Sequence, residues 1–284
     1  MLRKIIVPVR GDGMTQTVLG HASALAKHHG AHIVVAHCRK RAEDMRPYSR
    51  ALPSFARATM VAQSEELANQ EEQDLRAQLH QFMASLDIEE TERPHPGTAS
   101  VEFVEDFGQM ADVIKRTGRL ADLVAVAKPD RDRNIGTNSL QSALYQTGRP
   151  VLMCPSSGDV APDFGAHVTI AWNGSLEASR AVAMTLDIAR AARSLTILSG
   201  GKGEPHGTTA DELIEYYRLR GVDAGAHRFE ARNPGEALPK ITAELGASLL
   251  IMGAYGQNHE RETLFGGNTQ VVVDRSEIPV VLVH

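Results

Sequence analysis

The fold is decided by a stretch near the start of the chain, Ile6-Val7-Pro8-Val9-Arg10-Gly11-Asp12, which recurs as Thr169-Ile170-Ala171-Trp172-Asn173-Gly174-Ser175. The same offset aligns Ala24-Leu25-Ala26-Lys27 with Asp187-Ile188-Ala189-Arg190, on the helix that we expect to follow. Self-similarity at a fixed offset is the mark of a duplicated architecture. The sequence therefore indicates two copies of one unit.

Further matches extend the duplication toward the end of each copy. The run Ala121-Asp122-Leu123-Val124-Ala125-Val126 matches Ala247-Ser248-Leu249-Leu250-Ile251-Met252. A closing run, Arg149-Pro150-Val151-Leu152-Met153, matches Ile278-Pro279-Val280-Val281-Leu282. The whole unit, from its first strand to its last, is thus repeated.

A linker and the fold class follow from the same comparison. The run 154–163 is rich in turn-forming residues and bounded by prolines, so we expect domains at 1–158 and 159–284. Within each copy, short β-branched apolar runs alternate with stretches of helical periodicity, the pattern of βαβ units. Such strands are almost wholly apolar where helices cover both faces of a parallel sheet. We predict an α/β protein of two tandem Rossmann-like or flavodoxin-like domains, each with a five-stranded, mainly parallel sheet.

Individual elements can be placed most clearly in the second copy. A helix is expected from Leu176 to Ala192, with Ser175 as its N-cap and Glu177 in its first turn, where a carboxylate complements the helix dipole. In the first copy we expect a helix over 59–86 whose many Glu and Gln residues form a solvated face, after an irregular segment absent from the second copy. The strands of the second copy are expected near 168–172, 195–198, 224–229, 248–253 and 279–283.

Composition and charge exclude several classes of protein. The 284 residues are 42% hydrophobic and 23% charged, as in a soluble globular protein, with a net charge of −5. That charge disfavours nucleic acid and anionic membranes as partners, and no apolar run approaches the roughly 20 residues needed to cross a bilayer. The start of the chain has no signal-peptide pattern, and Cys38 and Cys154 form no Cys-x-x-Cys pair. We therefore expect a cytoplasmic protein with two buried, unpaired cysteines.

The sharpest local motif follows the predicted strand Leu249-Leu250-Ile251-Met252 directly. It reads Gly253-Ala254-Tyr255-Gly256, then nine residues, then Gly266-Gly267-Asn268-Thr269 at the start of a helix. Open parallel sheets bind ligands beyond the carboxyl ends of their strands, where a helix N-terminus offers unpaired N–H groups to phosphate. Glycines let the backbone approach anionic oxygens closely. The motif therefore predicts a phosphate-binding loop in the second copy.

These features together resemble the universal stress protein family. The Gly-x2-Gly-x9-Gly spacing, the closing Pro-Val-Val-Leu-Val strand and the Trp172-Asn173-Gly174-Ser175 turn look like the family's nucleotide-binding signature, and the duplication looks like its tandem type. The resemblance implies a five-stranded α/β domain that holds ATP in one subclass and no nucleotide in another. It also implies that the closing strands of the two copies pair, as across family dimers, so that the chain is an intramolecular pseudo-dimer. A further homodimer of the whole chain stays open, and the protein partner is not indicated.

The resemblance assigns a nucleotide site to the second copy. Asn173 would lie near the nucleoside, the first two glycines beside the ribose and phosphates, and the final run around the phosphate chain. The ligand would be ATP or another adenine nucleotide. The residues expected to bind it are Ala171, Trp172, Asn173, Gly174, Met252, Gly253, Gly256, Gly266, Gly267, Asn268 and Thr269.

Two departures from the family pattern bear on the ligand. Gly267 stands where the ATP-binding signature usually has Ser or Thr, and Thr269 replaces that hydroxyl only in part. Asn173 stands where the family usually has Asp, which removes a carboxylate although an amide still donates and accepts. Mg²⁺ could accompany the nucleotide, but a dependence on Mg²⁺ is not implied by these residues.

The first copy departs further, because its loop reads Ala127-Lys128-Pro129-Asp130-Arg131-Asp132-Arg133-Asn134-Ile135-Gly136-Thr137-Asn138-Ser139. One glycine remains, and a proline and charged residues replace the compliant loop. We expect a degenerate site there. Lys128, Arg131 and Arg133 could attract an anion, but a solvated loop followed by a capped helix is the simpler interpretation.

Three functions remain open at this stage. The leading one is a cytoplasmic stress-response protein that binds adenine nucleotide in the second domain with little or no turnover. The alternatives are an interaction protein whose pockets bind no nucleotide, and a slow ATP hydrolase. We predict no catalytic residue and no metal site, because no nucleophile with an oriented base is evident and His28 and His29 point to different helix faces. His259 and Glu260, between the glycines, are expected to be solvated.

Overall fold

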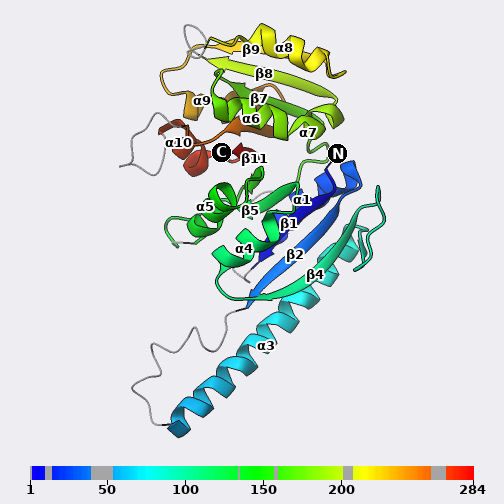
Figure 1. Ribbon diagram of the computed structural model, residues 1–284, viewed down its shortest axis with the longest axis vertical. Coiled ribbons are helices and arrows are strands. Elements are labelled where there is room, and N and C mark those ends of the chain that lie inside the picture. The colour runs from blue at the N-terminus through cyan, green and yellow to red at the C-terminus, as the bar shows by residue number, and fades with distance from the viewer. Residues whose placement is uncertain are drawn as a thin grey trace.

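The computed structural model describes residues 2–9, 15–39, 54–133, 135–156, 159–200, 207–256 and 267–284. Strands and helices alternate along both halves of the chain (Figure 1). The first half contains β1 (Lys4–Val9), α1 (Thr15–His29), β2 (His32–Arg39), α3 (Ser54–Ser85), β3 (Glu89–Glu90), β4 (Ser100–Phe107), α4 (Met110–Gly118), β5 (Leu123–Ala127), α5 (Thr137–Gln146) and β6 (Val151–Cys154). The second half contains β7 (His167–Trp172), α6 (Leu176–Met184), α7 (Leu186–Ala191), β8 (Ser194–Gly200), α8 (Ala210–Arg218), β9 (Ala224–Phe229), α9 (Pro234–Glu244), β10 (Leu249–Gly253), α10 (Gly267–Arg275) and β11 (Val280–Val283).

All described strands join one sheet, in the order β3-β4-β2-β1-β5-β6-β11-β10-β7-β8-β9. In each half the strands that match between the copies lie in the order third, second, first, fourth, fifth, which is the Rossmann arrangement. The predicted α/β class and the mainly parallel sheet are therefore confirmed. The expectation of five strands per copy needs one addition, the two-residue β3 beside β4 in the first half.

The two halves meet through their closing strands. β11 pairs with β6 in antiparallel register, Val281 opposite Leu152, whereas the other neighbouring strands of this sheet run parallel. Val281 and Leu152 are fully buried. The expected pairing of the closing strands is thus confirmed, and it makes one continuous sheet of what the sequence predicted as two.

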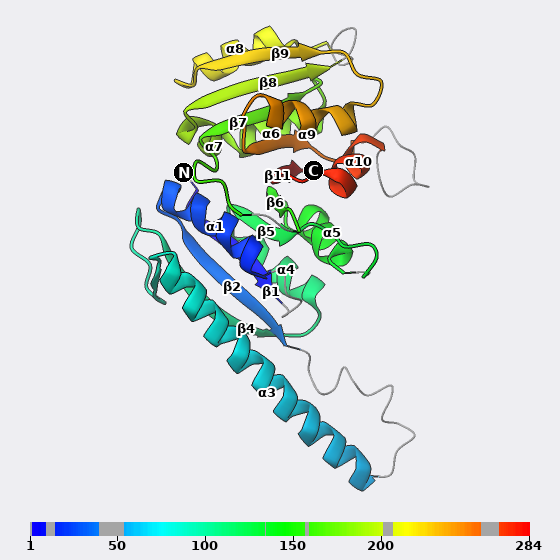
Figure 2. The ribbon, with the colours of Figure 1, turned by 180° about the vertical axis from the view of Figure 1, so that it is seen from behind.

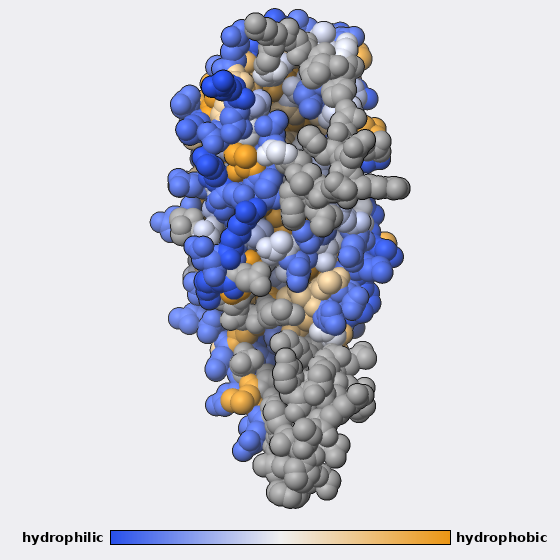
Figure 3. All heavy atoms as spheres, turned by 90° about the vertical axis from the view of Figure 1, so that its left-hand side faces the viewer, coloured by the Kyte–Doolittle hydropathy of each residue, from blue (hydrophilic) through white to orange (hydrophobic). Residues whose placement is uncertain are grey.

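Helices cover the sheet in two layers, seen from opposite sides in Figures 1 and 2. Helices α1, α3, α6, α7 and α8 contribute to one hydrophobic core, and α4, α5, α9 and α10 contribute to the other. Successive strand residues alternate between the cores, as Leu250 and Ile251 do in β10. Cys38 and Cys154 are both buried, as expected. On the side shown in Figure 3, hydrophilic residues predominate and hydrophobic ones are scattered.

Two predicted helices differ in detail from the structure. The helix expected from Leu176 to Ala192 breaks at Thr185, whose backbone leaves the helical region (φ −110°, ψ 15°). The Thr185 hydroxyl is buried and donates to the Ala181 carbonyl at 2.6 Å, a back-bond that bends helices. The other difference is α3, which begins at Ser54 and projects well beyond the sheet (Figure 1). No helix among the described residues is both long and apolar enough to span a bilayer.

Candidate functional site

A pocket of about 600 Å³ opens at the carboxyl ends of β7 and β10. The strand order reverses between these two strands, since β8 lies on the far side of β7 and β11 on the far side of β10. Helices α6 and α10 leave this edge in different directions, which opens a crevice where sheets of this kind bind ligands. The order of the strands therefore determines where in the sheet the pocket lies.

All but one of the sequence-predicted site residues line this pocket. Gly266 is the exception, because it lies outside the described residues, as do His259 and Glu260. That the lining residues contact a nucleotide remains a proposal. The predicted residues that the structure brings together are Ala171, Trp172, Asn173, Gly174, Met252, Gly253, Gly256, Gly267, Asn268 and Thr269.

The turn between β7 and α6 forms one wall and is held by its own side chains. Gly174 adopts φ +72°, a conformation that favours glycine. The Asn173 side-chain oxygen accepts from the Ser175 backbone N–H at 3.1 Å, and the Ser175 hydroxyl accepts from the Ala178 N–H at 3.2 Å. Trp172 is fixed by a bond from its indole N–H to the Thr208 carbonyl at 3.0 Å. Asn173 thus shapes the turn, and its amide nitrogen retains donors for a ligand.

The opposite wall is the loop after β10. Gly253 packs so closely on α6 that an added Cβ would lie 2.5 Å from the Ala178 backbone nitrogen. Tyr255 has φ +56°, which is uncommon for a residue with a side chain, and its N–H donates to the Thr269 hydroxyl oxygen at 3.3 Å. The Asn268 side-chain oxygen accepts from the Gly235 N–H at 3.3 Å. The side chains of the glycine motif therefore hold the loops together as well as lining the pocket.

Several lining residues were missed by reasoning from the sequence. Phe229, at the end of β9, and Leu238, on α9, supply apolar surface. The strand β9 and the helix α9 lie outside the motifs that the sequence singled out. Only the position of Phe229, at the carboxyl end of a strand, could have indicated from the sequence that it lines the pocket. Glu177 was assigned only to the helix dipole, yet its carboxylate faces the pocket beside Gly256.

The corresponding loop of the first half is fastened to the second half. The Lys128 ammonium donates to the Ser276 carbonyl at 3.0 Å, and the Arg131 guanidinium pairs with Asp274 at 2.9 Å. Burial lowers the pKa of Lys128, while Glu277 and Asp274 act against that shift. The interpretation of this segment as a solvated loop is therefore wrong for Lys128, which is partly buried against the C-terminal end of α10. Arg131 pairs with Asp274, but its side chain remains 63% exposed, as expected of a solvated loop.

A helix follows that loop, as expected, but it lacks the expected side-chain cap. Helix α5 begins at Thr137, and its N-cap residue is Gly136 at φ +86°, which has no side chain to cap the helix. Before it, Asp130 and Ile135 exchange two backbone hydrogen bonds of 2.9 Å that close the loop into a narrow ladder. This local ladder takes the place of the glycine loop in the second half.

An aromatic contact also joins the two halves. The ring of Tyr145, on α5, lies 5.7 Å from that of Tyr255 and 4.8 Å from that of His284. Burial raises the pKa of Tyr255, and Tyr145 adds to the shift. Tyr255 therefore connects the pocket wall with the first half of the chain.

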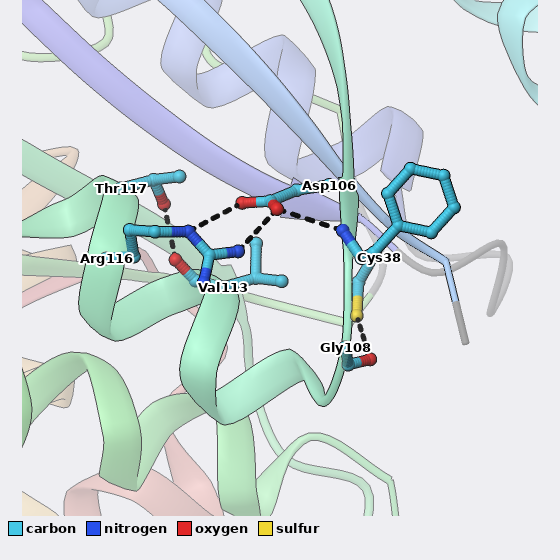
Figure 4. Close-up of polar contacts among 7 residues, drawn as sticks. Cys38, Asp106, Gly108, Val113, Arg116 and Thr117 are labelled. Carbon is cyan, nitrogen blue, oxygen red and sulfur yellow. Dashed lines mark hydrogen bonds and ion pairs between the residues drawn. The ribbon is translucent and has the colours of Figure 1, made fainter. Parts of the chain in front are cut away.

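A second hollow, of about 610 Å³, lies on the outer side of α4. Its lining includes Lys115, Arg116 and Arg119, which could attract an anion. Figure 4 shows that the Arg116 guanidinium is directed onto the Asp106 carboxylate, which raises the pKa of Arg116. The Cys38 thiol donates to the Gly108 carbonyl at 3.3 Å beside it. With its central cation already paired and its position away from the strand-order reversal, this hollow is the weaker candidate.

Comparisons with known proteins point to one family. The sequence matches the model of the universal stress protein family over residues 1–136 and 209–284. A comparison with curated proteins finds no significant match. A universal stress protein from Archaeoglobus fulgidus has a similar structure, with a TM-score of 0.70 at 16% identity over 99% of this chain and 97% of that one. A protein of unknown function from Pseudomonas aeruginosa PAO1 has a TM-score of 0.54 at 18% identity over 99% of this chain and 92% of that one.

One more match is a universal stress protein solved in complex with cAMP. It is 27% identical over 42% of this chain and 95% of its own, and its TM-score of 0.36 is too low to place a ligand here. The two whole-chain likenesses show the fold.

Proposed function

Because this chain belongs to the universal stress protein family, we propose that its second half binds an adenine nucleotide, ATP or a relative of it, in the pocket between β7 and β10. The observation that carries the proposal is the convergence on one crevice of three separate segments, 171–174, 252–256 and 267–269. The crevice lies where the strand order reverses, the position at which open parallel sheets bind nucleotides.

The proposal extends to the organisation of the chain. Residues 1–158 and 159–284 are then two family domains, joined through β6 and β11 into an intramolecular pseudo-dimer that acts in the cytoplasm. Little or no turnover is expected, because a hydrolase needs a base oriented by a partner. Glu177 is the only acid among the described lining residues, and its carboxylate accepts no hydrogen bond from a residue that the structure describes.

An interaction protein that binds no nucleotide is the second candidate. It is favoured by Asn173, whose oxygen serves the turn, and by Gly267, which offers no hydroxyl. Mass spectrometry of ligands released from freshly purified native protein separates the two candidates. An adenine compound in near-stoichiometric amount supports nucleotide binding, whereas repeated preparations without any adenine compound, and without rebinding on titration, favour the interaction protein.

We expect one adenine nucleotide per chain in a calorimetric titration. The physical reason is that the first half's loop has lost the glycine motif and that Lys128 and Arg131 are committed to the second half. A stoichiometry near two would contradict the prediction, as would full binding by a chain whose pocket has been blocked by Gly256→Val.

That substitution should abolish binding while leaving the fold intact. An added Cβ at Gly256 would lie 3.1 Å from Oε2 of Glu177, the mobile end of a side chain, so the backbone need not move. The valine methyl groups would then occupy the crevice itself. The control is Gly225→Val on β9, where an added Cβ meets nothing within 4 Å. Unchanged affinity in Gly256→Val, with the melting temperature retained, would rule out this pocket.

A further inference from the structure

Glu177 is the single charged residue among the described residues that line the pocket. The others are apolar, glycine or neutral polar residues, and none is Lys, Arg or His. The side chain is almost fully buried, with 5% of the residue exposed. Phosphate sites usually contain a cation or several free N–H groups, so a lone buried carboxylate is unusual in a pocket of this kind.

The surroundings of Glu177 do not neutralise its charge by pairing. No hydrogen bond or ion pair joins its carboxylate to another residue that the structure describes. It lies in the first turn of α6, where the helix dipole favours a negative group. That dipole stabilises the carboxylate and leaves its negative field directed into the crevice.

The carboxylate lies beside the first two glycines of the motif, which we propose to contact the ribose and phosphates. Oε2 lies 3.1 Å from where a Cβ of Gly256 would be, and the main chain of Glu177 packs against Gly253. Nearby N–H groups at the start of α6 are already used, since Ser175 N–H and Ala178 N–H donate to the Asn173 and Ser175 side chains. An anion that binds here would be repelled by the carboxylate and could not be stabilised by those two N–H groups.

We infer that Glu177 sets the charge of the ligand, so that the pocket selects adenosine and adenosine monophosphate over ATP. The inference rests on the proposed function, since it specifies which adenine compound the same pocket takes. Each added phosphate brings negative charge toward a buried carboxylate in a partly desolvated crevice, where like charges repel more strongly than in water. Apolar surface from Phe229 and Leu238 favours the base and is indifferent to the phosphate count.

The test compares three ligands with the wild-type protein and three variants. Dissociation constants for adenosine, AMP and ATP are measured by calorimetry in EDTA, which removes divalent cations that would screen the phosphates. The wild-type protein should bind AMP about tenfold more tightly than ATP, and Glu177→Gln should remove most of that difference by strengthening ATP binding. Adenosine should bind the two proteins with closely similar affinity. Glu244→Gln, on the exposed end of α9, is the matched control for the same change of net charge.

The conservative variant separates charge from packing. Glu177→Asp keeps the carboxylate and should keep the preference for AMP, even if its melting temperature falls. Equal or tighter binding of ATP by the wild-type protein would overturn the inference, as would a Glu177→Gln variant in which all three affinities change alike. Absence of binding by all three ligands to every protein would overturn the proposed function itself, whereas binding without charge discrimination would overturn only the role of Glu177.

Discussion

Replacing Val281 with Lys should destabilise the whole chain by about 4 kcal/mol, because it places an ammonium group in the middle of the seam between the halves. Val281 is fully buried, lies between β10 and β6, and faces Leu152 and Ile251 across the sheet. Helices cover both faces at this point, which leaves the new charge no short path to water. Thermal melting should show a fall of roughly 10 °C, with exposed hydrophobic surface or self-association.

The matched control is Leu219→Lys, since Leu219 is 70% exposed and a lysine there stays in water. That variant should melt within about 2 °C of the wild type. A Val281→Lys protein that is monodisperse and melts in one unshifted transition would mean that the closing strands do not form a buried interface in solution.

Replacing Gly253 with Ala should have the second-largest effect, costing about 3 kcal/mol of stability and the nucleotide affinity together. The added Cβ would lie 2.5 Å from both the Ala178 nitrogen and the Glu177 carbonyl carbon, and backbone atoms cannot yield as a side-chain end can. Helix α6 would have to move away from β10, which would widen the floor of the pocket. Chemical denaturation and calorimetric titration measure the two losses.

Gly225→Ala is the control for this prediction. Gly225 also lies in a strand, but its added Cβ meets nothing within 4 Å and it lies away from the pocket. That change should be neutral or stabilise by up to about 1 kcal/mol through the unfolded chain. If Gly253→Ala behaved like Gly225→Ala, the close packing of β10 on α6 would not exist in solution.

The fold could be predicted largely because the chain repeats itself. A strand expected near 224–229 is observed as Ala224–Phe229, and the closing strand begins one residue later than expected, at Val280. What the sequence could not show depends on tertiary contacts. The break at Thr185 occurs without a glycine or proline, since it depends on a buried hydroxyl that bonds Ala181 only once the helix has packed.

The sequence predicted those site residues that belong to a local motif. It missed the residues that reach the pocket only through the packing of distant elements. Glycine spacing and the Asn173 turn indicated the ends of β7 and β10, and the structure gathers their described residues around one pocket. Phe229 and Leu238 carry no motif, because they reach the pocket only through the positions of β9 and α9. Lys128 resembled a solvated lysine because its acceptor, the Ser276 carbonyl, is 148 residues away in the chain.

The antiparallel seam also determines which halves can pair with which. By the alignment of the two copies, Asp274 in the second half corresponds to Tyr145 in the first, and the loop of Arg131 corresponds to that of Tyr255. The junction therefore has two different contacts, an ion pair of Arg131 with Asp274 and a ring contact of Tyr255 with Tyr145.

If two first halves paired through the same seam, Arg131 of each would face Tyr145 of the other. If two second halves paired, Tyr255 of each would face Asp274 of the other. Each half thus complements the other better than it complements itself, which is how partner selectivity arises at an interface with a twofold origin. Duplication on one chain made this possible, since a substitution in a homodimer changes both sides of the axis at once. We expect this asymmetry to favour pairing of the two halves of one molecule over exchange with a neighbouring molecule.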